Sequence, residues 1–261
     1  MGPPGAWPIL PVRTAPATMR QPPTKTRLMK LLAIETATDT CSAALWIDGE
    51  LCERFEVAPQ RQSELILPMM DALLAEAGLR PAQLDALAFG RGPGSFTGVR
   101  IATGVAQGVA FAAGLPVVGV STLAALAQGH LGATGCRRVL AAYDARMGEV
   151  YWAACEADGE GVMRVSGEEL VVPADGVPMP EGIDWQGVGS GWAAYGEALA
   201  RRLGGRVMRI DAEARCHARD VARIGAIDFA AGRAVPAEQA LPVYLRDRVA
   251  WKTQRPSEPR S

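Results

Sequence analysis

The stretch 90–100 is rich in glycine and lies where a predicted strand passes into a predicted helix. It reads Gly-Arg-Gly-Pro-Gly-Ser-Phe-Thr-Gly-Val-Arg. Glycines let other chain segments approach closely, and Ser95 or Thr97 can cap the helix by accepting a hydrogen bond from a free N–H group. A helix N-terminus of this kind suits an anion, so Gly92, Gly94 and Ser95 are candidates for contacting a phosphate group. The spacing matches neither a P-loop nor the dinucleotide fingerprint, so a tight connection without a ligand stays open.

Two acidic residues, Glu35 and Asp144, stand at the ends of predicted strands. An ATP-dependent small-molecule kinase needs carboxylates that hold Mg²⁺ in such places, and together with Thr36 they form a candidate nucleotide-proximal set. The turns Thr36–Asp39 and Ala145–Gly148 lack the paired glycine and hydroxyl residues of a phosphate clamp. This disfavours the kinase, which we keep as the alternative function.

The chain has only two histidines, His130 and His217, and they lie far apart. No helical His-x-x-x-His pair exists, so the commonest way to hold a catalytic metal is missing and we expect no metal site. No pairing of a nucleophile with histidine supports a peptidase. The five cysteines are scattered and never spaced as Cys-x-x-Cys, which indicates a reducing compartment and predicts a cytoplasmic protein.

Composition places the chain among soluble globular proteins, with 49% hydrophobic and 21% charged residues. The net charge of -1 gives no field that attracts nucleic acid, so contact with RNA needs a local patch or a partner. Residues 101–136 carry no charge, but Gly114-Leu115-Pro116 interrupts this run after about a dozen residues, whereas a membrane span needs about twenty. We therefore expect buried protein there.

A pattern of strands and turns begins at Leu31. A buried strand, an acidic turn from Glu35, a second strand, the hairpin signal Asp48-Gly49 and a third strand follow each other. A similar block begins at Val139 and has its own hairpin signal, Asp158-Gly159. Each half of the actin, sugar-kinase and Hsp70 superfamily opens in this way. The repeat predicts two similar α/β halves, and their likeness to this superfamily implies a duplicated actin-like ATPase (ribonuclease H-like) α/β fold with mixed sheets in two subdomains.

These patterns divide the chain into four parts. Residues 1–28 are rich in proline, contain no acid and are expected to be a disordered leader, with Met29 as the true start. Residues 29–135 form the predicted N-terminal subdomain and carry the partner-binding helices. Residues 136–250 form the C-terminal subdomain, in which we find no independent catalytic constellation, and 251–261 form a disordered tail.

Two predicted helices, Ser63–Ala77 and Thr97–Ala113, are more apolar than one core face requires. The apolar residues of the first cover an arc of about 200°, and the second has only a thin polar line. Either both helices are internal to one domain, or another protein chain covers part of their surface. The second interpretation predicts an interface formed by Leu65, Met69, Met70, Leu73, Leu74, Arg100, Thr103, Gln107 and Phe111.

Five long motifs carry a resemblance to a known family. They are residues 29–38 (Met-Lys-Leu-Leu-Ala-Ile-Glu-Thr-Ala-Thr), 90–100, 119–127 (Gly-Val-Ser-Thr-Leu-Ala-Ala-Leu-Ala), 144–152 (Asp-Ala-Arg-Met-Gly-Glu-Val-Tyr-Trp) and 242–250 (Pro-Val-Tyr-Leu-Arg-Asp-Arg-Val-Ala). In these motifs the chain resembles the bacterial TsaB (YeaZ) family. The match is strong up to about Val150, thin through the middle of the second half, and returns near the C-terminus.

The resemblance implies an actin-like fold and a role in making N6-threonylcarbamoyladenosine beside the anticodon of tRNAs that read codons beginning with A. In that system the relative TsaD binds metal through His-x-x-x-His and transfers the threonylcarbamoyl group from its adenylate. The TsaB family lacks those ligands and is the partner that TsaD needs. Many of its members carry histidine where this chain has Gln62, a departure that weakens a metal site further.

The resemblance therefore implies a non-catalytic dimerisation and activating subunit without a cofactor of its own. Its partners would be a TsaD-like catalytic subunit and a TsaE-like ATPase, and it would reach tRNA only through the complex. Two points stay open at this stage. One is whether a nucleotide binds at the partner interface, and the other is whether isolated chains form a homodimer.

Overall fold

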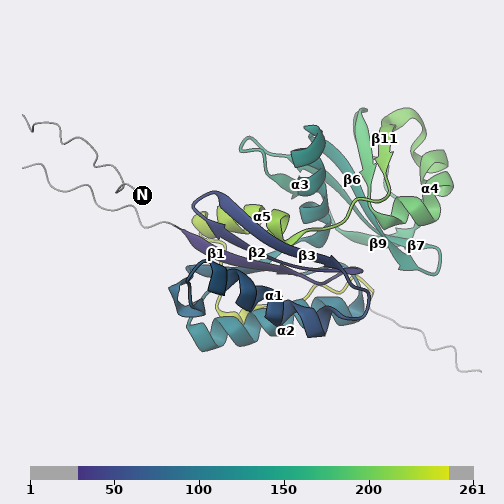
Figure 1. Cartoon of the computed structure of the whole chain (residues 1–261). Coiled ribbons are helices and arrows are strands. Elements are labelled where there is room, and N and C mark those ends of the chain that lie inside the picture. The colour runs from purple at the N-terminus through teal and green to yellow at the C-terminus, as the bar shows by residue number, and fades with distance from the viewer. Residues whose placement is uncertain (1–28, 247–261) are drawn as a thin grey trace, which may run out of the picture.

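The computed structural model describes residues 29–246, and two mixed β-sheets frame this part of the chain (Figure 1). The strands of the first sheet are β1 (Lys30–Glu35), β2 (Thr40–Ile47), β3 (Glu50–Val57), β4 (Ala86–Gly90) and β5 (Val117–Val120). Their spatial order is β3-β2-β1-β4-β5, with β1 antiparallel to β2 and parallel to β4. Residues 31–35 are buried without alternation, as expected for a central strand covered on both faces.

The second sheet repeats this arrangement. Its strands are β6 (Arg138–Arg146), β7 (Glu149–Ala157), β8 (Met163–Val165), β9 (Leu170–Pro173), β10 (Trp185–Val188) and β11 (Val207–Asp211). The order is β11-β10-β6-β7-β8, and β9 also pairs with β7. Thus β6 is antiparallel to β7 and parallel to β10, as β1 is to β2 and β4. The duplicated actin-like fold predicted from the sequence is confirmed.

Helices cover both sheets and make the molecule a stack of layers (Figure 1). The helices are α1 (Gln62–Glu76), α2 (Phe96–Ala113), α3 (Thr122–Thr134), α4 (Ser190–Leu203) and α5 (Ala218–Ala230). α1 and α2 lie on the outer face of the first sheet, and α4 packs against the second sheet on the far side of the molecule. Between the sheets α3 and α5 contact each other. Residues 29–246 also contain four single 3-10 turns: Pro81–Gln83, Ala174–Gly176, Gly204–Arg206 and Ala237–Gln239.

The two inner helices are exchanged between the halves. α3 follows β5 in the chain but packs on β6, β7 and β8, whereas α5 follows β11 but packs on β1, β2, β4 and β5. The predicted boundary between residues 135 and 136 separates the strands of the first sheet from those of the second. α3 and α5 each pack on the sheet that lies on the other side of this boundary. The predicted leader 1–28 and tail 251–261 lie outside the described residues.

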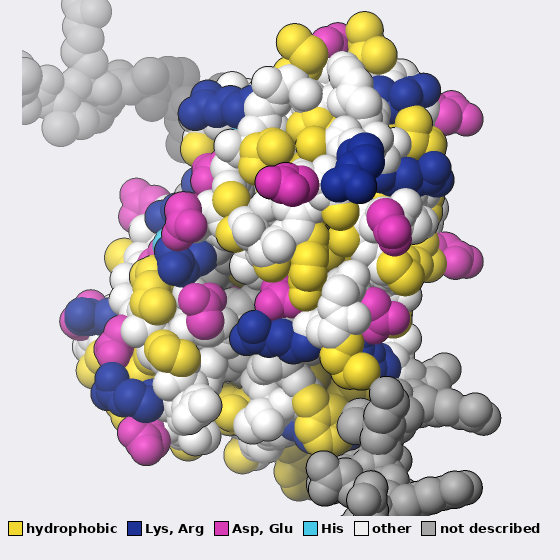
Figure 2. Space-filling view, turned by 90° about the vertical axis from the view of Figure 1, so that its right-hand side faces the viewer, with side chains coloured by type: hydrophobic (Ala, Val, Ile, Leu, Met, Phe, Trp, Pro, Cys, Tyr) yellow, Lys and Arg dark blue, Asp and Glu magenta, His cyan; other side chains and the backbone are white. Residues whose placement is uncertain are grey.

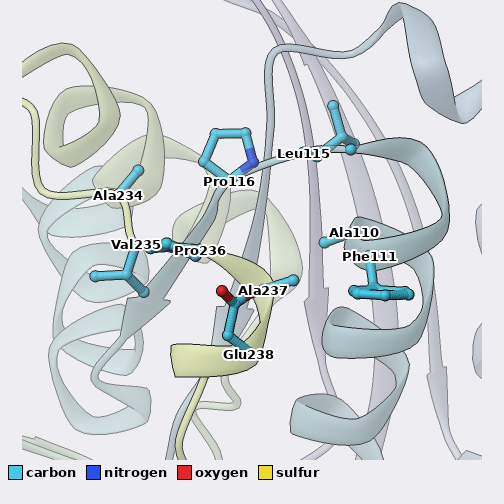
Figure 3. Close-up of a pocket in the computed structure, with 10 residues that line it drawn as sticks. Ala110, Phe111, Leu115, Pro116, Ala234, Val235, Pro236, Ala237 and Glu238 are labelled. Atoms are coloured by element: carbon cyan, nitrogen blue, oxygen red, sulfur yellow. The ribbon is translucent and has the colours of Figure 1, made fainter.

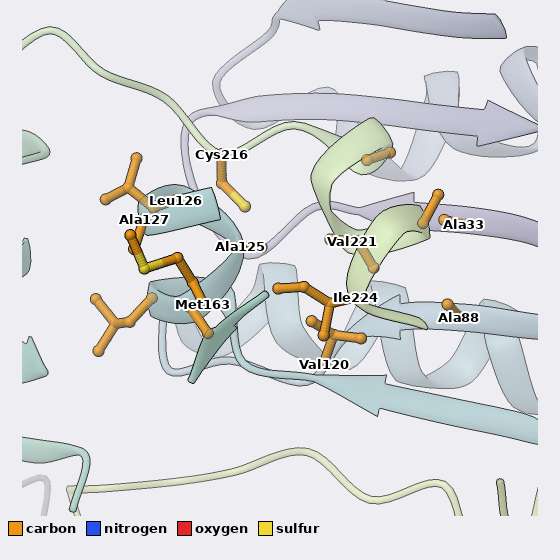
Figure 4. Packing of buried hydrophobic residues seen from close by; sticks show 14 of the residues in the cluster. Ala33, Ala88, Val120, Ala125, Leu126, Ala127, Met163, Cys216, Val221 and Ile224 are labelled. Carbon is orange, nitrogen blue, oxygen red and sulfur yellow. The ribbon is translucent and has the colours of Figure 1, made fainter. Parts of the chain in front are cut away.

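One hydrophobic cluster joins the two halves across the exchanged helices (Figure 4). It contains Ala33 and Ala88 of the first sheet, Leu126 of α3, Met163 of the second sheet and Ile224 of α5. Each of these side chains is 3% exposed or less. The halves therefore share a core and hold each other in place. None of the described helices is both long and apolar enough to cross a membrane.

Candidate functional site

The glycine-rich loop connects β4 to α2 and contains a cis peptide bond between Gly92 and Pro93. The Oγ atom of Ser95 accepts a hydrogen bond of 3.0 Å from the N–H group of Gly98. Ser95 is therefore the N-cap of α2, which confirms one of the two caps that the sequence offered.

The glycines of this loop lie against the turn that follows β1. A Cβ atom on Gly94 would overlap the carbonyl oxygen of Ala37, and one on Gly98 would overlap that of Thr36. The N–H group of Ser95 donates to the Ala37 carbonyl at 2.7 Å, and the Thr36 hydroxyl donates to the Gly98 carbonyl at 2.7 Å. The structure thus brings the candidates Thr36, Gly94 and Ser95 together and gives the glycines a packing reason. A phosphate contact of these residues stays a prediction.

Glu35 is buried completely where the two halves meet. Its carboxylate accepts hydrogen bonds from the N–H of Ala37 at 2.5 Å and the hydroxyl of Thr122 at 3.0 Å, and the Cys216 thiol lies 3.6 Å away. Burial raises the pKa of Glu35, and these hydrogen bonds oppose the rise. A Cβ atom on Gly90 would overlap this carboxylate, so the backbone of Gly90 packs directly against Glu35.

Asp144 lies at the end of β6 and bonds within the second half. One of its carboxylate oxygens accepts from the N–H of Arg146 at 2.7 Å and from the hydroxyl of Tyr195 at 3.1 Å. The other lies 2.9 Å from the Arg146 guanidinium. Glu35 and Asp144, which the kinase alternative would pair, thus have separate sets of partners.

Several polar residues where the halves meet were missed by the sequence analysis. Glu169 accepts from Arg91 at 2.7 Å and from the Ser121 hydroxyl at 2.5 Å, and so links a loop of the second half to the glycine loop. The hydroxyl of Tyr143 is buried close to the backbone of Cys216, and burial raises the pKa values of Tyr143 and Cys216. No motif marks these residues, because each gains its neighbours from distant parts of the chain.

Gln62, the predicted departure from the family pattern, is a structural residue at the start of α1. Its side chain is 7% exposed and donates to the carbonyl of Thr38 at 2.8 Å. It fastens α1 to the turn after β1. Within residues 29–246 no group of three or more His, Cys, Asp or Glu side chains is arranged to hold a metal ion.

The predicted interface on α1 and α2 requires correction. Met70, Leu73 and Leu74 are 2–4% exposed and pack in the chain's own core beneath α1, so the prediction that they face a partner is wrong. Thr103 is 4% exposed and its hydroxyl donates to the carbonyl of Val99. Gln107 is half-buried and donates to the carbonyl of Ala240. The first sheet covers most of the wide apolar face of α1.

One face of α2 stays open. Thr97, Arg100, Gly104, Gly108 and Phe111 recur every three or four residues, and we call them the α2 stripe. All five are exposed, with Phe111 at 79%. A Cβ atom on Gly104 or Gly108 would meet no other atom within 4 Å. Leu65 and Met69 on α1 are partly buried against the core. Arg100 and Phe111 are thus the predicted interface residues that the structure leaves exposed.

A shallow groove begins where the α2 stripe ends. Ala110 and Phe111 form one side of it, and residues 234–238 form the other (Figure 3). Leu115 and Pro116 also line it, and the groove has a volume of about 480 Å³. It adds an apolar hollow to the open face of α2.

Known proteins similar to the chain identify the family to which it belongs. A family model described as TsaD, tRNA N6-adenosine threonylcarbamoyltransferase, matches residues 56–252. The chain is 45% identical over 233 residues to the tRNA threonylcarbamoyladenosine biosynthesis protein TsaB of Escherichia coli, covering 86% of this chain and 97% of that protein. The Haemophilus influenzae protein of the same name is 37% identical, with 86% and 96% covered. The solved structure of YeaZ from Pseudomonas aeruginosa has a TM-score of 0.78 and 46% identity, covering 83% of this chain and 100% of that one.

Proposed function

The chain belongs to the TsaB (YeaZ) family of tRNA threonylcarbamoyladenosine biosynthesis proteins, within the wider TsaD-related family, and on this premise we propose that it is a non-catalytic dimerisation and activating subunit. Its partner in this proposal is a TsaD-like catalytic chain, which modifies the adenosine next to the anticodon. A TsaE-like ATPase joins the complex, and tRNA reaches this chain only through it. We assign no cofactor to the chain itself. If the complex binds a nucleotide, we place it at the interface with the partner.

The open α2 stripe is the observation that carries this proposal. Most of the apolar surface of α1 and α2 is covered by the first sheet, but Gly104 and Gly108 face open space and Phe111 is 79% exposed. Two glycines four residues apart leave a flat strip along which another helix can lie close to the backbone. An exposed aromatic side chain beside such a strip is typical of a protein interface.

The state of the two acidic candidates supports a role without catalysis. Glu35 is fully buried beneath Gly90, and Asp144 is bonded to Arg146 and Tyr195. A kinase needs carboxylates that reach Mg²⁺ and a phosphate. The kinase alternative therefore has less support than the subunit role.

Co-expression with the TsaD-like protein of the same organism tests the proposal. We expect the two chains to elute together in size-exclusion chromatography and to restore tRNA modification in cells that lack this chain. The variant Gly108→Arg places a long charged side chain on the α2 stripe and should weaken the complex by about tenfold or more. Gly196→Arg on α4 is the matched control, since a Cβ atom there also meets nothing within 4 Å. Equal binding by both variants would remove the α2 stripe from the interface.

A further inference from the structure

Arg100 lies beside two aromatic rings at the beginning of the α2 stripe. Its guanidinium carbon lies 3.2 Å from the ring centre of Phe96 and 5.0 Å from that of Tyr244. The two ring centres are 5.8 Å apart, and the ring planes are inclined by 40°. Phe96 is 60% and Tyr244 41% exposed. The three side chains therefore form a cation–aromatic cluster that is open to solvent, which we call the Arg100 cluster.

Residues 241–246 hold the third member of this cluster in place, and we call them the C-terminal strap. The N–H group of Val243 donates to the carbonyl of Arg91 at 2.8 Å, and Arg246 forms an ion pair with Glu149. Tyr244 lies between these two attachments. Phe96 and Arg100 are four residues apart in the first turns of α2 and so lie on adjacent positions of the helix. The cluster is thus fixed by the fold before any partner arrives.

None of the ion pairs within the described residues includes Arg100. The other arginines near the junction of the halves are paired: Arg91 with Glu169, Arg146 with Asp144 and Arg246 with Glu149. Figure 2 shows the same mixture, with Lys and Arg side chains in dark blue next to Asp and Glu side chains in magenta at the level where the two halves meet. Arg100 is the exception in this region.

The Arg100 guanidinium lies over the Phe96 ring and donates no hydrogen bond within the described residues, so its N–H groups remain available to a ligand. Two parallel N–H groups match the two oxygen atoms of a carboxylate or a phosphate. Ordering an arginine side chain usually lowers the affinity, but here the rings have already limited its freedom. The cluster is therefore a prepared receptor for an anion that offers two adjacent oxygen acceptors.

We propose that the Arg100 cluster binds an Asp or Glu side chain of the protein partner that covers the α2 stripe. This rests on the proposed function, since Arg100 lies on the same face as Gly104 and Gly108. Arginine and large aromatic side chains are the types that dominate the binding energy of protein interfaces. A nucleic-acid backbone fits less well, because acidic residues outnumber basic ones in the described part of the chain.

Binding of the TsaD-like protein to Arg100→Gln measures the contribution of the cluster. We expect the dissociation constant to rise about 30-fold, the size of an interface hot spot, and its dependence on salt to become weaker. Arg209→Gln is the matched control, because Arg209 on β11 is exposed and has no ion pair among the described residues. Circular dichroism checks that both variants are folded. Unchanged affinity of a folded Arg100→Gln protein would refute the receptor.

Carbodiimide cross-linking identifies the anion. The lysine introduced by Arg100→Lys should couple to an Asp or Glu of the partner, and peptide mass spectrometry would locate the bond. A complex that forms but gives no such cross-link overturns the assignment, as does a variant that loses affinity for tRNA while keeping the protein partner. If the wild-type chain itself binds no TsaD-like protein, the proposed function fails instead. If Gly108→Arg abolishes binding and Arg100→Gln does not, only the receptor fails.

Discussion

Two neighbouring helices of the sequence, α2 and α3, have opposite surroundings. Both are rich in small residues, and both carry a pair of glycines on one face. On α2 a Cβ atom at Gly104 or Gly108 would meet nothing within 4 Å. On α3 a Cβ atom at Gly129 would lie 2.8 Å from a carboxylate oxygen of Asp220, and one at Gly132 would lie 3.2 Å from the guanidinium of Arg223.

The difference shows what a glycine pair on a helix means in this fold. The glycines of α3 make room for α5, which arrives from the other half of the molecule. Those of α2 make room for nothing in the described part of the chain. The same composition therefore occurs in one place at a buried contact between two helices, α3 and α5, which we call the sealed seam, and in the other place on an open face. The following experiments compare sealed positions with open ones.

The largest effect is expected on α1, which carries both a buried and an exposed leucine. Leu73 is 2% exposed, so Leu73→Glu buries a charge among apolar neighbours and should unfold the chain, at a cost above about 4 kcal/mol. Leu67 is 47% exposed, and Leu67→Glu should change stability by less than about 1 kcal/mol. Urea unfolding followed by circular dichroism measures both. A folded Leu73→Glu protein would contradict the sealed position.

A pH-dependent effect of intermediate size is expected at the sealed seam. Burial raises the pKa of Asp220 from 3.8 to about 6, while Arg219, Arg223 and His217 oppose the rise. Since this pKa is higher in the folded state, the folded chain keeps a proton that the unfolded chain loses between about pH 4 and 6. The contribution to stability is therefore full below pH 4 and falls by about 3 kcal/mol as the pH rises through this window.

The variant Asp220→Asn isolates this contribution, because its side chain does not titrate. We expect its unfolding free energy to fall less between pH 4 and 7 than that of the wild-type chain, by an amount of the order of the 3 kcal/mol above. The exposed Asp71 on α1 provides the control variant Asp71→Asn. Parallel pH profiles for the wild-type chain and Asp220→Asn would show that the seam does not hold this proton.

Added bulk compares the two glycine pairs directly. Gly129→Leu forces a side chain against Asp220 and should cost about 1–3 kcal/mol. Gly108→Leu should leave the unfolding free energy unchanged or raise it by up to about 1 kcal/mol, because leucine favours a helix over glycine. The same Gly108→Leu protein should bind the TsaD-like partner more weakly. The comparison fails if both variants lose equal stability.

The smallest effect is expected at the beginning of the α2 stripe, in the Arg100 cluster. Tyr244→Ala removes one of the two rings beside Arg100 and should weaken partner binding by about 0.5–1 kcal/mol, the usual size of an exposed cation–aromatic contact. Calorimetric titration with the TsaD-like protein measures it. Tyr151→Ala, on β7 of the other half, is a control for the general loss of a tyrosine ring. A loss as large as that of Arg100→Gln would place the main contact on Tyr244 itself.

Much of the fold could be predicted because its signals are local. The repeated strand, turn and hairpin pattern gave the duplicated architecture, and its topology is observed in both sheets. Asp48 and Gly49 adopt the positive φ angles that a tight hairpin needs, and Ser95 caps α2 as expected. Each of these features depends on residues within a few positions of one another.

The candidate site could be predicted only in part. Thr36, Gly94 and Ser95 do come together, since the turn after β1 packs on the glycine loop. Leu73 was placed on the wrong side of α1. Hydrophobicity alone cannot show which part of a wide apolar arc the sheet will cover. The cluster of Arg100 with Tyr244 had no local signal at all.

The sequence by itself determined most of the strands, the two hairpin signals, the serine cap of α2 and the family to which the chain belongs, whereas β8, β9 and β11 carried no signal. Only the tertiary structure decided that α3 and α5 change places, that Glu35 is buried beneath Gly90, and that α2 keeps an open face. The physical reason is the range of the interactions. Backbone angles and caps respond to nearby residues, whereas burial depends on which distant segment arrives to cover a surface, and that is settled by the packing of the whole chain.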